Sequence, residues 1–205
     1  MTAVAFDLGG VLLDWDPRHL YRTLFDDDDE AMEHFLATVC TPQWNEHNDR
    51  GRPLAEGVAL LSAEHPEHAE LIEAFAARWS ETVAGPIDGT VQVLAELIET
   101  GTPVYALSNW SAETFASARN RYDFLEWFDG MVISGQEGVI KPEPRIFEIL
   151  CERWALEPAT TIFVDDTQAN VDAARELGFR AIRFHDPPQL RAALVDAGLL
   201  SERRG

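Results

Sequence analysis

Cysteine is scarce in this chain, and so are long apolar runs. Cys40 and Cys151 are the two cysteines, far apart and without the C-x-x-C spacing of a zinc or redox motif. No apolar run approaches the roughly 18 residues of a membrane helix, and no basic region precedes the first apolar segment. We therefore expect no disulfide framework, zinc site, membrane span or signal peptide. These absences favour a cytoplasmic protein.

Basic residues are also few. The chain has 16 Lys and Arg against 36 Asp and Glu, which gives a formal net charge of −20. Such a charge repels phosphate backbones and anionic membrane surfaces, so neither nucleic acid nor a membrane is expected as a partner. We interpret the acidic run at 26–30 as a solvated loop and helix start rather than a cation site. The sequence leaves the oligomeric state open.

The 205 residues do contain the pattern of an α/β domain. Helical patterns at 88–101 and 170–178 alternate with short apolar runs, which are nearly continuous in apolarity and so suit strands covered on both faces. Strand and helix alternation predicts a parallel sheet between helical layers. The predicted strands are 3–8, 103–108, 131–135, 161–165 and 180–184.

A long connection interrupts this alternation after the first strand. It contains no convincing strand, and its helical patterns lie at 17–25, 29–40, 53–63 and 67–83. A connection of this length is not a normal strand-to-helix loop, so it predicts a separately packed helical subdomain. The expected boundaries are 1–14 and 86–205 for the α/β core and 15–85 for the helical subdomain.

Polar residues stand where the predicted strands end. Asp7 ends the first strand, Ser108 and Asn109 end the second, and Asp165 and Asp166 end the fourth, while Lys141 follows the third. Each alone is an ordinary turn, cap or loop residue. Parallel strands end at one sheet edge, however, and three carboxylates packed there are unfavourable unless a cation offsets them. The oxygen ligands favour Mg²⁺.

Four segments in this order resemble the motifs of the haloacid dehalogenase (HAD) superfamily: "FDLGGV", "LSN", "KPEP" and "FVDD". The resemblance implies a Rossmann-like three-layer core, and the insert is similar to that superfamily's type 1 cap. The "DLGGV" pattern, together with "LLDWD" and "KPEPRI", is also similar to a subgroup that includes a bacterial α-D-glucose-1-phosphate phosphatase.

The resemblance implies roles for individual residues and a Mg²⁺-dependent phosphatase of a small phosphorylated metabolite, such as a sugar phosphate. Asp7 would be the nucleophile that forms an aspartyl-phosphate. Ser108 and Lys141 would hold the phosphoryl oxygens, and the backbone at Gly9 and Gly10 would approach the phosphate closely. The implied Mg²⁺ ligands are Asp7, the Gly9 carbonyl, Asp166, and Asp165 directly or through water.

Two alternatives remain open. In the metal-independent 2-haloacid dehalogenases of the same superfamily, a serine replaces the first carboxylate of the fourth motif, and tyrosines stand two residues after the nucleophile and six after the lysine. Here those places hold Asp165, Gly9 and Phe147, so we favour a phosphatase. The other alternative is a weakly catalytic protein that binds a phosphorylated ligand.

Gly9 departs from the commonest phosphatase pattern, in which an Asp at this place protonates the leaving alcohol and then activates water. One hypothesis is a preference for leaving groups that need little protonation, such as anomeric sugars. The other is that a different residue transfers the proton: Asp14, Asp16, His47 or Asp49. Asp14 and Asp16 are equally well explained as turn and cap residues before Pro17.

The segment 41–53 is the least helix-like part of the insert. We predict that it is a turn-rich loop reaching into the mouth of the site, with His47 and Arg50 in contact with substrate. A surface connection between two helices is the alternative. Asn109 and Trp110 are also expected to line the substrate pocket.

Overall fold

The computed structural model describes residues 2–202, and its centre is a five-stranded parallel sheet with the strand order β5-β4-β1-β6-β7. All five predicted strands are confirmed. Their bounds are β1 Ala3–Phe6, β4 Val104–Ser108, β5 Gly130–Ile133, β6 Thr161–Asp165 and β7 Arg180–Arg183. Because β1 pairs with both β4 and β6, residues at the ends of these three strands are neighbours.

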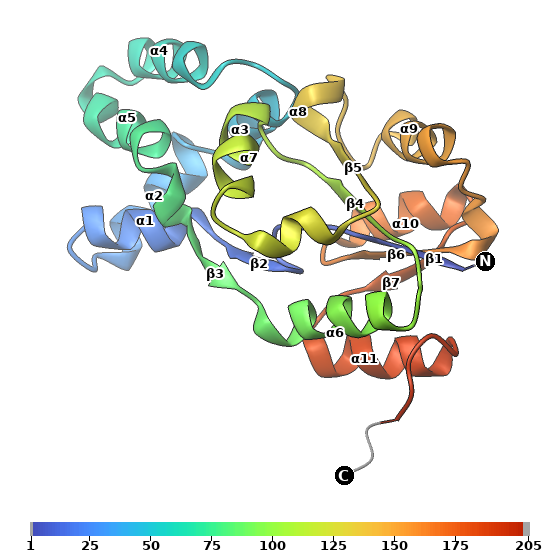
Figure 1. The fold of residues 1–205 in the computed structure, drawn as a ribbon. Helices are drawn as coiled ribbons and strands as arrows, with labels where there is room; N and C mark the ends of the chain where they lie inside the picture. Colours follow the sequence, from blue (N-terminus) through green and yellow to red (C-terminus); the bar gives the residue numbers. More distant parts are fainter. Residues whose placement is uncertain (1, 203–205) are drawn as a thin grey trace.

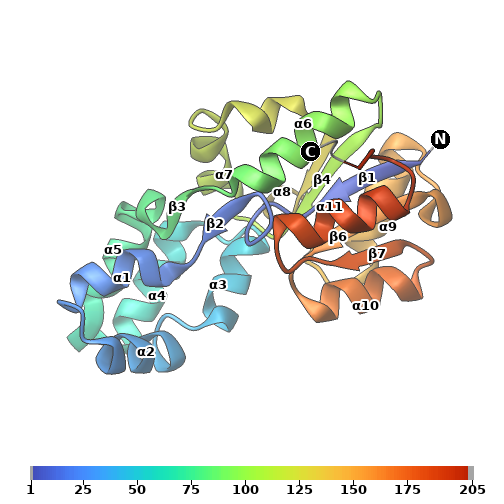
Figure 2. The same ribbon diagram turned by 90° about the horizontal axis from the view of Figure 1, so that it is seen from below.

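Helices cover both faces of this sheet (Figures 1 and 2). Val4 and Phe6 of β1 face a cluster that includes α6, α7 and α11. Ala3 and Ala5 face the opposite cluster with α9 and α10. Strands buried on both faces explain the near-continuous apolarity of these runs. The helices are α6 Asp88–Glu99, α7 Ala112–Arg119, α8 Ser134–Glu137, α9 Pro144–Trp154, α10 Gln168–Glu176 and α11 Pro187–Asp196, with short 3₁₀ turns η3 Asp123–Trp127 and η4 Pro158–Thr160.

The connection after β1 forms a helical group with its own apolar core, centred on Tyr21, Phe35 and Phe75. We call residues 16–82 the helical insert. Its elements are α1 Pro17–Leu24, α2 Asp29–Thr38, α3 Pro42–Asp49, α4 Leu54–Glu64, η1 Pro66–His68, α5 Ala69–Ala77 and η2 Trp79–Thr82. Figure 2 shows this group beside the sheet rather than on either face of it. The acidic run at 26–30 is a turn and helix start, with Asp28 capping α2.

The structure corrects two expectations for this region. Two strands that were not predicted, β2 Leu13–Trp15 and β3 Val83–Pro86, pair antiparallel and join the insert to the core. The expected boundaries at 15 and 85 fall inside these strands. The segment 41–53 is also not a loop, because α3 occupies 42–49 with Thr41 Oγ1 accepting from the backbone N–H of Trp44 at 3.1 Å.

Two further observations bear on the sequence expectations. Cys40 is buried, and neither it nor Cys151 forms a disulfide. Within residues 2–202, no helix combines the length and apolarity needed to cross a lipid bilayer.

Candidate active site

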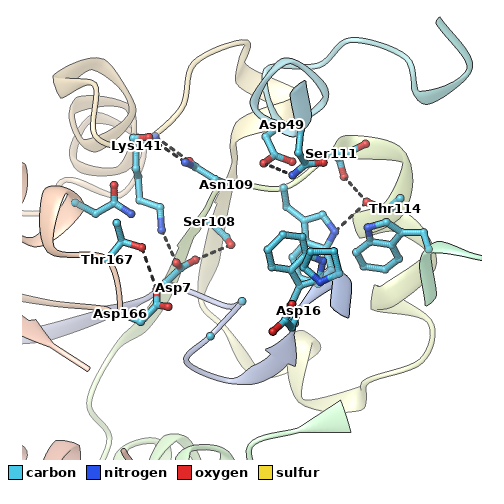
Figure 3. A pocket seen from close by; sticks show the side chains of 18 of the residues that line it. Asp7, Asp16, Asp49, Ser108, Asn109, Ser111, Thr114, Lys141, Asp166 and Thr167 are labelled. Carbon is cyan, nitrogen blue, oxygen red and sulfur yellow. Dashed lines mark hydrogen bonds and ion pairs between the residues drawn. The ribbon is translucent and has the colours of Figure 1, made fainter. Parts of the chain in front are cut away.

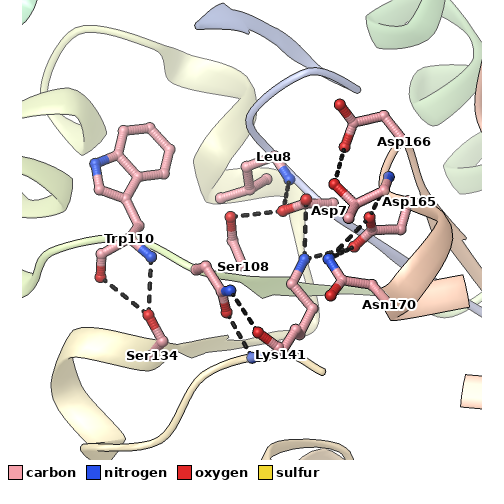
Figure 4. A network of polar contacts seen from close by, with 11 residues as sticks. Asp7, Leu8, Ser108, Trp110, Ser134, Lys141, Asp165, Asp166 and Asn170 are labelled. Carbon is pink, nitrogen blue, oxygen red and sulfur yellow. Dashed lines mark hydrogen bonds and ion pairs between the residues drawn. The ribbon is translucent and has the colours of Figure 1, made fainter. Parts of the chain in front are cut away.

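The carboxylate of Asp7 lies at the centre of a polar network beyond the end of β1 (Figure 4). Its Oδ1 accepts hydrogen bonds from Ser108 Oγ at 2.7 Å and from the backbone N–H of Leu8 at 2.7 Å. Its Oδ2 lies 2.9 Å from Lys141 Nζ. Burial raises the pKa of Asp7, while Lys141 opposes this effect and Asp165 adds to it. The network therefore fixes the orientation of a buried carboxylate.

Lys141 reaches this network from the loop between α8 and α9. Only 2% of the residue is exposed, and Nζ also lies 2.7 Å from Asp165 Oδ2. Burial alone would lower the pKa of Lys141, but the attraction of Asp165 and Asp7 outweighs it, so the lysine stays charged. Asn109 positions the lysine backbone, since its side chain donates to Lys141 O at 2.9 Å and accepts from Lys141 N at 2.8 Å.

The two carboxylates at the end of β6 have different surroundings. Asp165 is fully buried and accepts from the backbone N–H of Thr167 at 2.8 Å and from Asn170 Nδ2 at 3.1 Å, in addition to its contact with Lys141. Asp166 instead lines the cavity, and burial together with Asp165 raises its pKa. Asp165 therefore orients the lysine, whereas Asp166 faces the open site.

Asn170 was missed by sequence reasoning. It comes from the first turn of α10, is buried, and lines the cavity. Its place five residues after Asp165 was the available signal, but an asparagine at a helix start is ordinarily explained as a local capping residue.

Carboxylate oxygens of Asp7, Asp165 and Asp166 lie within 4.8 Å of one another. Among residues 2–202, Lys141 is the one cationic side chain that forms ion pairs with these acids, namely Asp7 and Asp165. A hard divalent cation with oxygen ligands fits this excess of negative charge. Gly10 permits the close packing, because a Cβ there would lie 2.5 Å from Asp166 Oδ2. The donor set thus suits a metal ion.

A cavity of about 370 Å³ opens from this polar network toward the helical insert (Figure 3). The core residues that line it include eight that the sequence analysis singled out, whereas Asp165 does not line it. The eight are Asp7, Gly9, Gly10, Ser108, Asn109, Trp110, Lys141 and Asp166. The helical insert and the two-stranded ribbon of β2 and β3 contribute an apolar wall that includes Trp15, Leu54, Phe75 and Trp79. Trp79 packs on Trp110 with ring centroids 5.4 Å apart. The cavity is therefore polar at its base and aromatic on its sides.

The structure does not bring His47 and Arg50 into this cavity. Both are exposed, and Arg50 forms an ion pair with Glu143 of the core. The physical reason is α3: helical periodicity places Asn45 and Asp49, four residues apart, on the cavity side and turns His47 away. The segment does approach the site, through Asn45, which was not predicted, and through Asp49, which the sequence offered as a proton-transfer candidate.

Asp14 and Asp16 also occupy different places. The side chain of Asp14 is 56% exposed and contacts His19 at 3.1 Å outside the cavity. Asp16 lines the cavity and caps α1, accepting from the backbone N–H of Arg18 at 2.9 Å and from its guanidinium at 3.2 Å. The capping role expected for Asp16 is confirmed.

Comparisons with known proteins agree with this arrangement. The sequence matches the haloacid dehalogenase-like hydrolase family over residues 1–178. It is 28% identical over 194 residues to a sesquiterpene phosphatase of Aspergillus oryzae, covering 90% of each chain. It is 27% identical over 191 residues to a phosphorylated carbohydrates phosphatase of Thermotoga maritima, covering 89% of this chain and 84% of that protein.

A solved structure shows the same fold. It is a HAD family enzyme of Bacteroides thetaiotaomicron in complex with magnesium and inorganic phosphate, with a TM-score of 0.68, 22% identity, and coverage of 91% of this chain and 95% of that one. The family match spans most of the sequence, and the four motifs meet at one edge of the central sheet. This chain therefore belongs to the haloacid dehalogenase-like hydrolases and is a hydrolytic enzyme.

Proposed function

We propose that this hydrolase is a Mg²⁺-dependent phosphatase that cleaves a small phosphorylated metabolite through an aspartyl-phosphate. The observation that carries the proposal is the setting of Asp7. Its carboxylate is held by Ser108 and Lys141 at 2.7 and 2.9 Å, at the base of a cavity that Asp166 also lines. An oriented carboxylate beside a hydroxyl, an ammonium group and further acids suits attack on a phosphoryl group.

Each of these side chains has its own role in the proposed reaction. An Asp7 oxygen attacks phosphorus, the bond from phosphorus to the leaving oxygen breaks, and water later hydrolyses the aspartyl-phosphate. Ser108 Oγ and Lys141 Nζ bind the phosphoryl oxygens and stabilise their negative charge. Asp165 and Asn109 position Lys141 by the contacts described above. The backbone at Gly9 and Gly10 leaves room for the phosphate.

Asp7, the carbonyl of Gly9 and Asp166 would hold the Mg²⁺, with Asp165 in reach directly or through water. Bound there, the ion offsets the negative charge of the phosphoryl group and of the crowded carboxylates.

The residues favour this reaction over dehalogenation. The fourth motif keeps Asp165, where the dehalogenases have serine. Phe147, at the place of one dehalogenase tyrosine, is fully buried and packs on Phe163 with ring centroids 5.3 Å apart. It belongs to the apolar core under the sheet and does not line the cavity.

The cavity supports a sugar phosphate as the first substrate class to test. Sugar rings present an apolar face that packs on aromatic side chains, and hydroxyl groups that bind amides and carboxylates. Trp79 and Trp110 offer the first kind of surface, and Asn45 and Asp49 offer the second. One relative is named for phosphorylated carbohydrates and another for sesquiterpenes, so terpenyl phosphates belong in the same panel.

The test is phosphate release from a panel of phosphorylated metabolites, with Mg²⁺ or with EDTA, for the unmodified enzyme and for Asp7→Asn. The proposal expects turnover that needs both Mg²⁺ and Asp7. Halide release from 2-haloacids in EDTA would identify a dehalogenase instead. Phosphate binding without any Asp7-dependent turnover would identify a binding protein.

A further inference from the structure

Asp49 lies on the wall that the helical insert contributes to the cavity, while Asp7 lies at the cavity base (Figure 3). Asp49 is the last residue of α3, and Asn45 is one helical turn before it. Asn45 Nδ2 donates to Asp49 Oδ2 at 3.0 Å. This bond holds one carboxylate oxygen and so fixes the orientation of the group toward the cavity.

The core holds this end of α3 in place. Ser134 Oγ, at the start of α8, donates to the backbone carbonyl of Asp49 at 2.6 Å. The next residue, Arg50, pairs with Glu143 of the core. Gly51 packs so closely on the Gly135 carbonyl that a Cβ would lie 2.9 Å from its oxygen. Asp49 therefore belongs to the insert by sequence but is fixed relative to the core, which is what a residue acting on a core-bound phosphoryl group requires.

The other acidic side chains that line the cavity, among the described residues, already have other roles. Asp7 is the proposed nucleophile, and Asp166 belongs to the metal site. Asp16 accepts hydrogen bonds from two groups of Arg18 and caps α1. Asp14 and His47 do not line the cavity at all. Of the four residues that might replace the missing acid at Gly9, Asp49 alone is both in the cavity and free of a helix-capping role.

We propose that Asp49 is the proton-transfer residue of this enzyme; the proposal rests on the phosphatase function proposed above. As the bond from Asp7 to phosphorus forms and the bond to the leaving oxygen breaks, the protonated Asp49 gives its proton to that oxygen. In the second step, a water oxygen bonds to phosphorus, the Asp7 oxygen leaves, and the Asp49 carboxylate takes the water proton. Asp49 thus ends each cycle protonated, as it began.

The electrostatic surroundings of Asp49 support both roles. Burial raises its pKa to about 7; the Ser111 backbone N–H and Lys141 oppose this rise, and Glu46 adds to it. Arg18, Asp16, Asp7 and Asp166 are the other charged groups that line the cavity. A carboxyl group with a pKa near neutral exchanges protons readily at the working pH, which favours general acid and base catalysis.

The test uses two substrates of similar shape, p-nitrophenyl phosphate, whose leaving group needs no proton, and benzyl phosphate, whose alkoxide leaving group does. For Asp49→Asn, kcat/KM should fall roughly 100-fold or more with benzyl phosphate and less than about fivefold with p-nitrophenyl phosphate. His47→Gln, on the exposed side of the same helix, is the matched control and should change neither value. Retained activity on p-nitrophenyl phosphate also shows that the variant is folded.

Equal losses of kcat/KM on both substrates would overturn the proposal, since they indicate a binding or structural role. No loss on benzyl phosphate would also overturn it and would favour an enzyme that works without a proton donor. Failure of the phosphatase function itself is separately visible: the unmodified enzyme would then show no turnover that Asp7→Asn abolishes.

Discussion

Ser134 Oγ donates a hydrogen bond of 2.6 Å to the backbone carbonyl of Asp49, which joins the first residue of α8 in the core to the last residue of α3 in the helical insert. The same hydroxyl oxygen accepts from the backbone N–H of Trp110 at 2.9 Å. One fully buried serine thus connects the insert, the loop after β4 and the end of β5. The position of the cavity wall relative to Asp7 depends on this contact.

Replacing this serine should disturb the wall. In Ser134→Ala, the N–H of Trp110 and the carbonyl of Asp49 both lose a partner, and we expect the free energy of unfolding to fall by about 1–3 kcal/mol. Activity on benzyl phosphate should fall more than activity on p-nitrophenyl phosphate, because Asp49 is displaced. Urea titration and kcat/KM measure the two effects. An unchanged ratio of the two activities would contradict the assigned role of this contact.

Lys141 offsets two buried carboxylates, so its removal should be costly for stability. In Lys141→Met, Asp7 and Asp165 lose the ammonium group that lies 2.9 and 2.7 Å from them. Breaking a buried ion pair from one side typically costs about 3–5 kcal/mol. We expect a loss of this order in the free energy of unfolding, measured by urea titration in EDTA, together with loss of turnover.

Arg145→Gln is the control for this variant. Arg145 follows Lys141 closely in the sequence, but its ion pairs with Glu148 and Glu152 are exposed to solvent. Exposed pairs contribute little, so the free energy of unfolding should hardly change. Similar losses in the two variants would show that burial of Lys141 does not matter to stability.

The central sheet could be predicted from sequence because each strand is buried on both faces and is therefore apolar throughout. The two-stranded ribbon of β2 and β3 could not be predicted in this way. Its strands have 3 and 4 residues, and the pairing of Leu13 with Pro86 and Asp14 with Gly85 depends on contacts across the whole insert. Neither strand carries a local pattern that distinguishes it from a linker.

The helix α3 was missed for a related reason. Of its eight residues only Trp44 and Asn48 are buried, so the sequence has no apolar face with helical spacing. Thr41 followed by Pro42, at the N-cap and first helical positions, was the signal that could have identified it. Because a loop imposes no periodicity on its side chains, the sequence could not show that Asn45 and Asp49 share the side that faces the site. It therefore named His47 and Arg50 as substrate contacts, left Asp49 as one of four proton-transfer candidates and overlooked Asn45.

Gly10 offers a test of the metal site. Its φ is +73°, and a Cβ there would lie 2.5 Å from Asp166 Oδ2. Gly10→Ala should therefore push Asp166 out of place and weaken Mg²⁺ binding roughly tenfold or more, as loss of a supporting contact at a metal site commonly does. The shift in thermal unfolding midpoint on Mg²⁺ addition measures this, because a ligand of the native state stabilises it.

Gly138→Ala separates the clash from backbone strain. Gly138 has nearly the same φ, +75°, but nothing lies within 4 Å of its Cβ position. Both variants should lose stability, because a left-handed conformation costs roughly 1–2 kcal/mol for an L-residue. The midpoint shift caused by Mg²⁺ should be preserved in Gly138→Ala and reduced in Gly10→Ala. Equal shifts in both would rule out the contact between Gly10 and Asp166 as a requirement for the metal.

The raised pKa of Asp49 predicts a pH dependence of stability. Burial raises the pKa from its ordinary 3.8 to about 7, so between these values the native state binds more protons at this group than the unfolded state. Linkage then requires that the free energy of unfolding falls as pH rises through this range. Asp49→Asn removes the group. Between pH 4 and 7, the free energy of unfolding of this variant should therefore fall by up to roughly 4 kcal/mol less than that of the unmodified enzyme, at about 1.4 kcal/mol per pKa unit. Urea titrations of both proteins in EDTA measure the difference, with Glu64→Gln, which removes an exposed acid of the insert, as the control. Parallel curves for Asp49→Asn and the unmodified enzyme would show that Asp49 ionises as freely in the fold as in the unfolded chain.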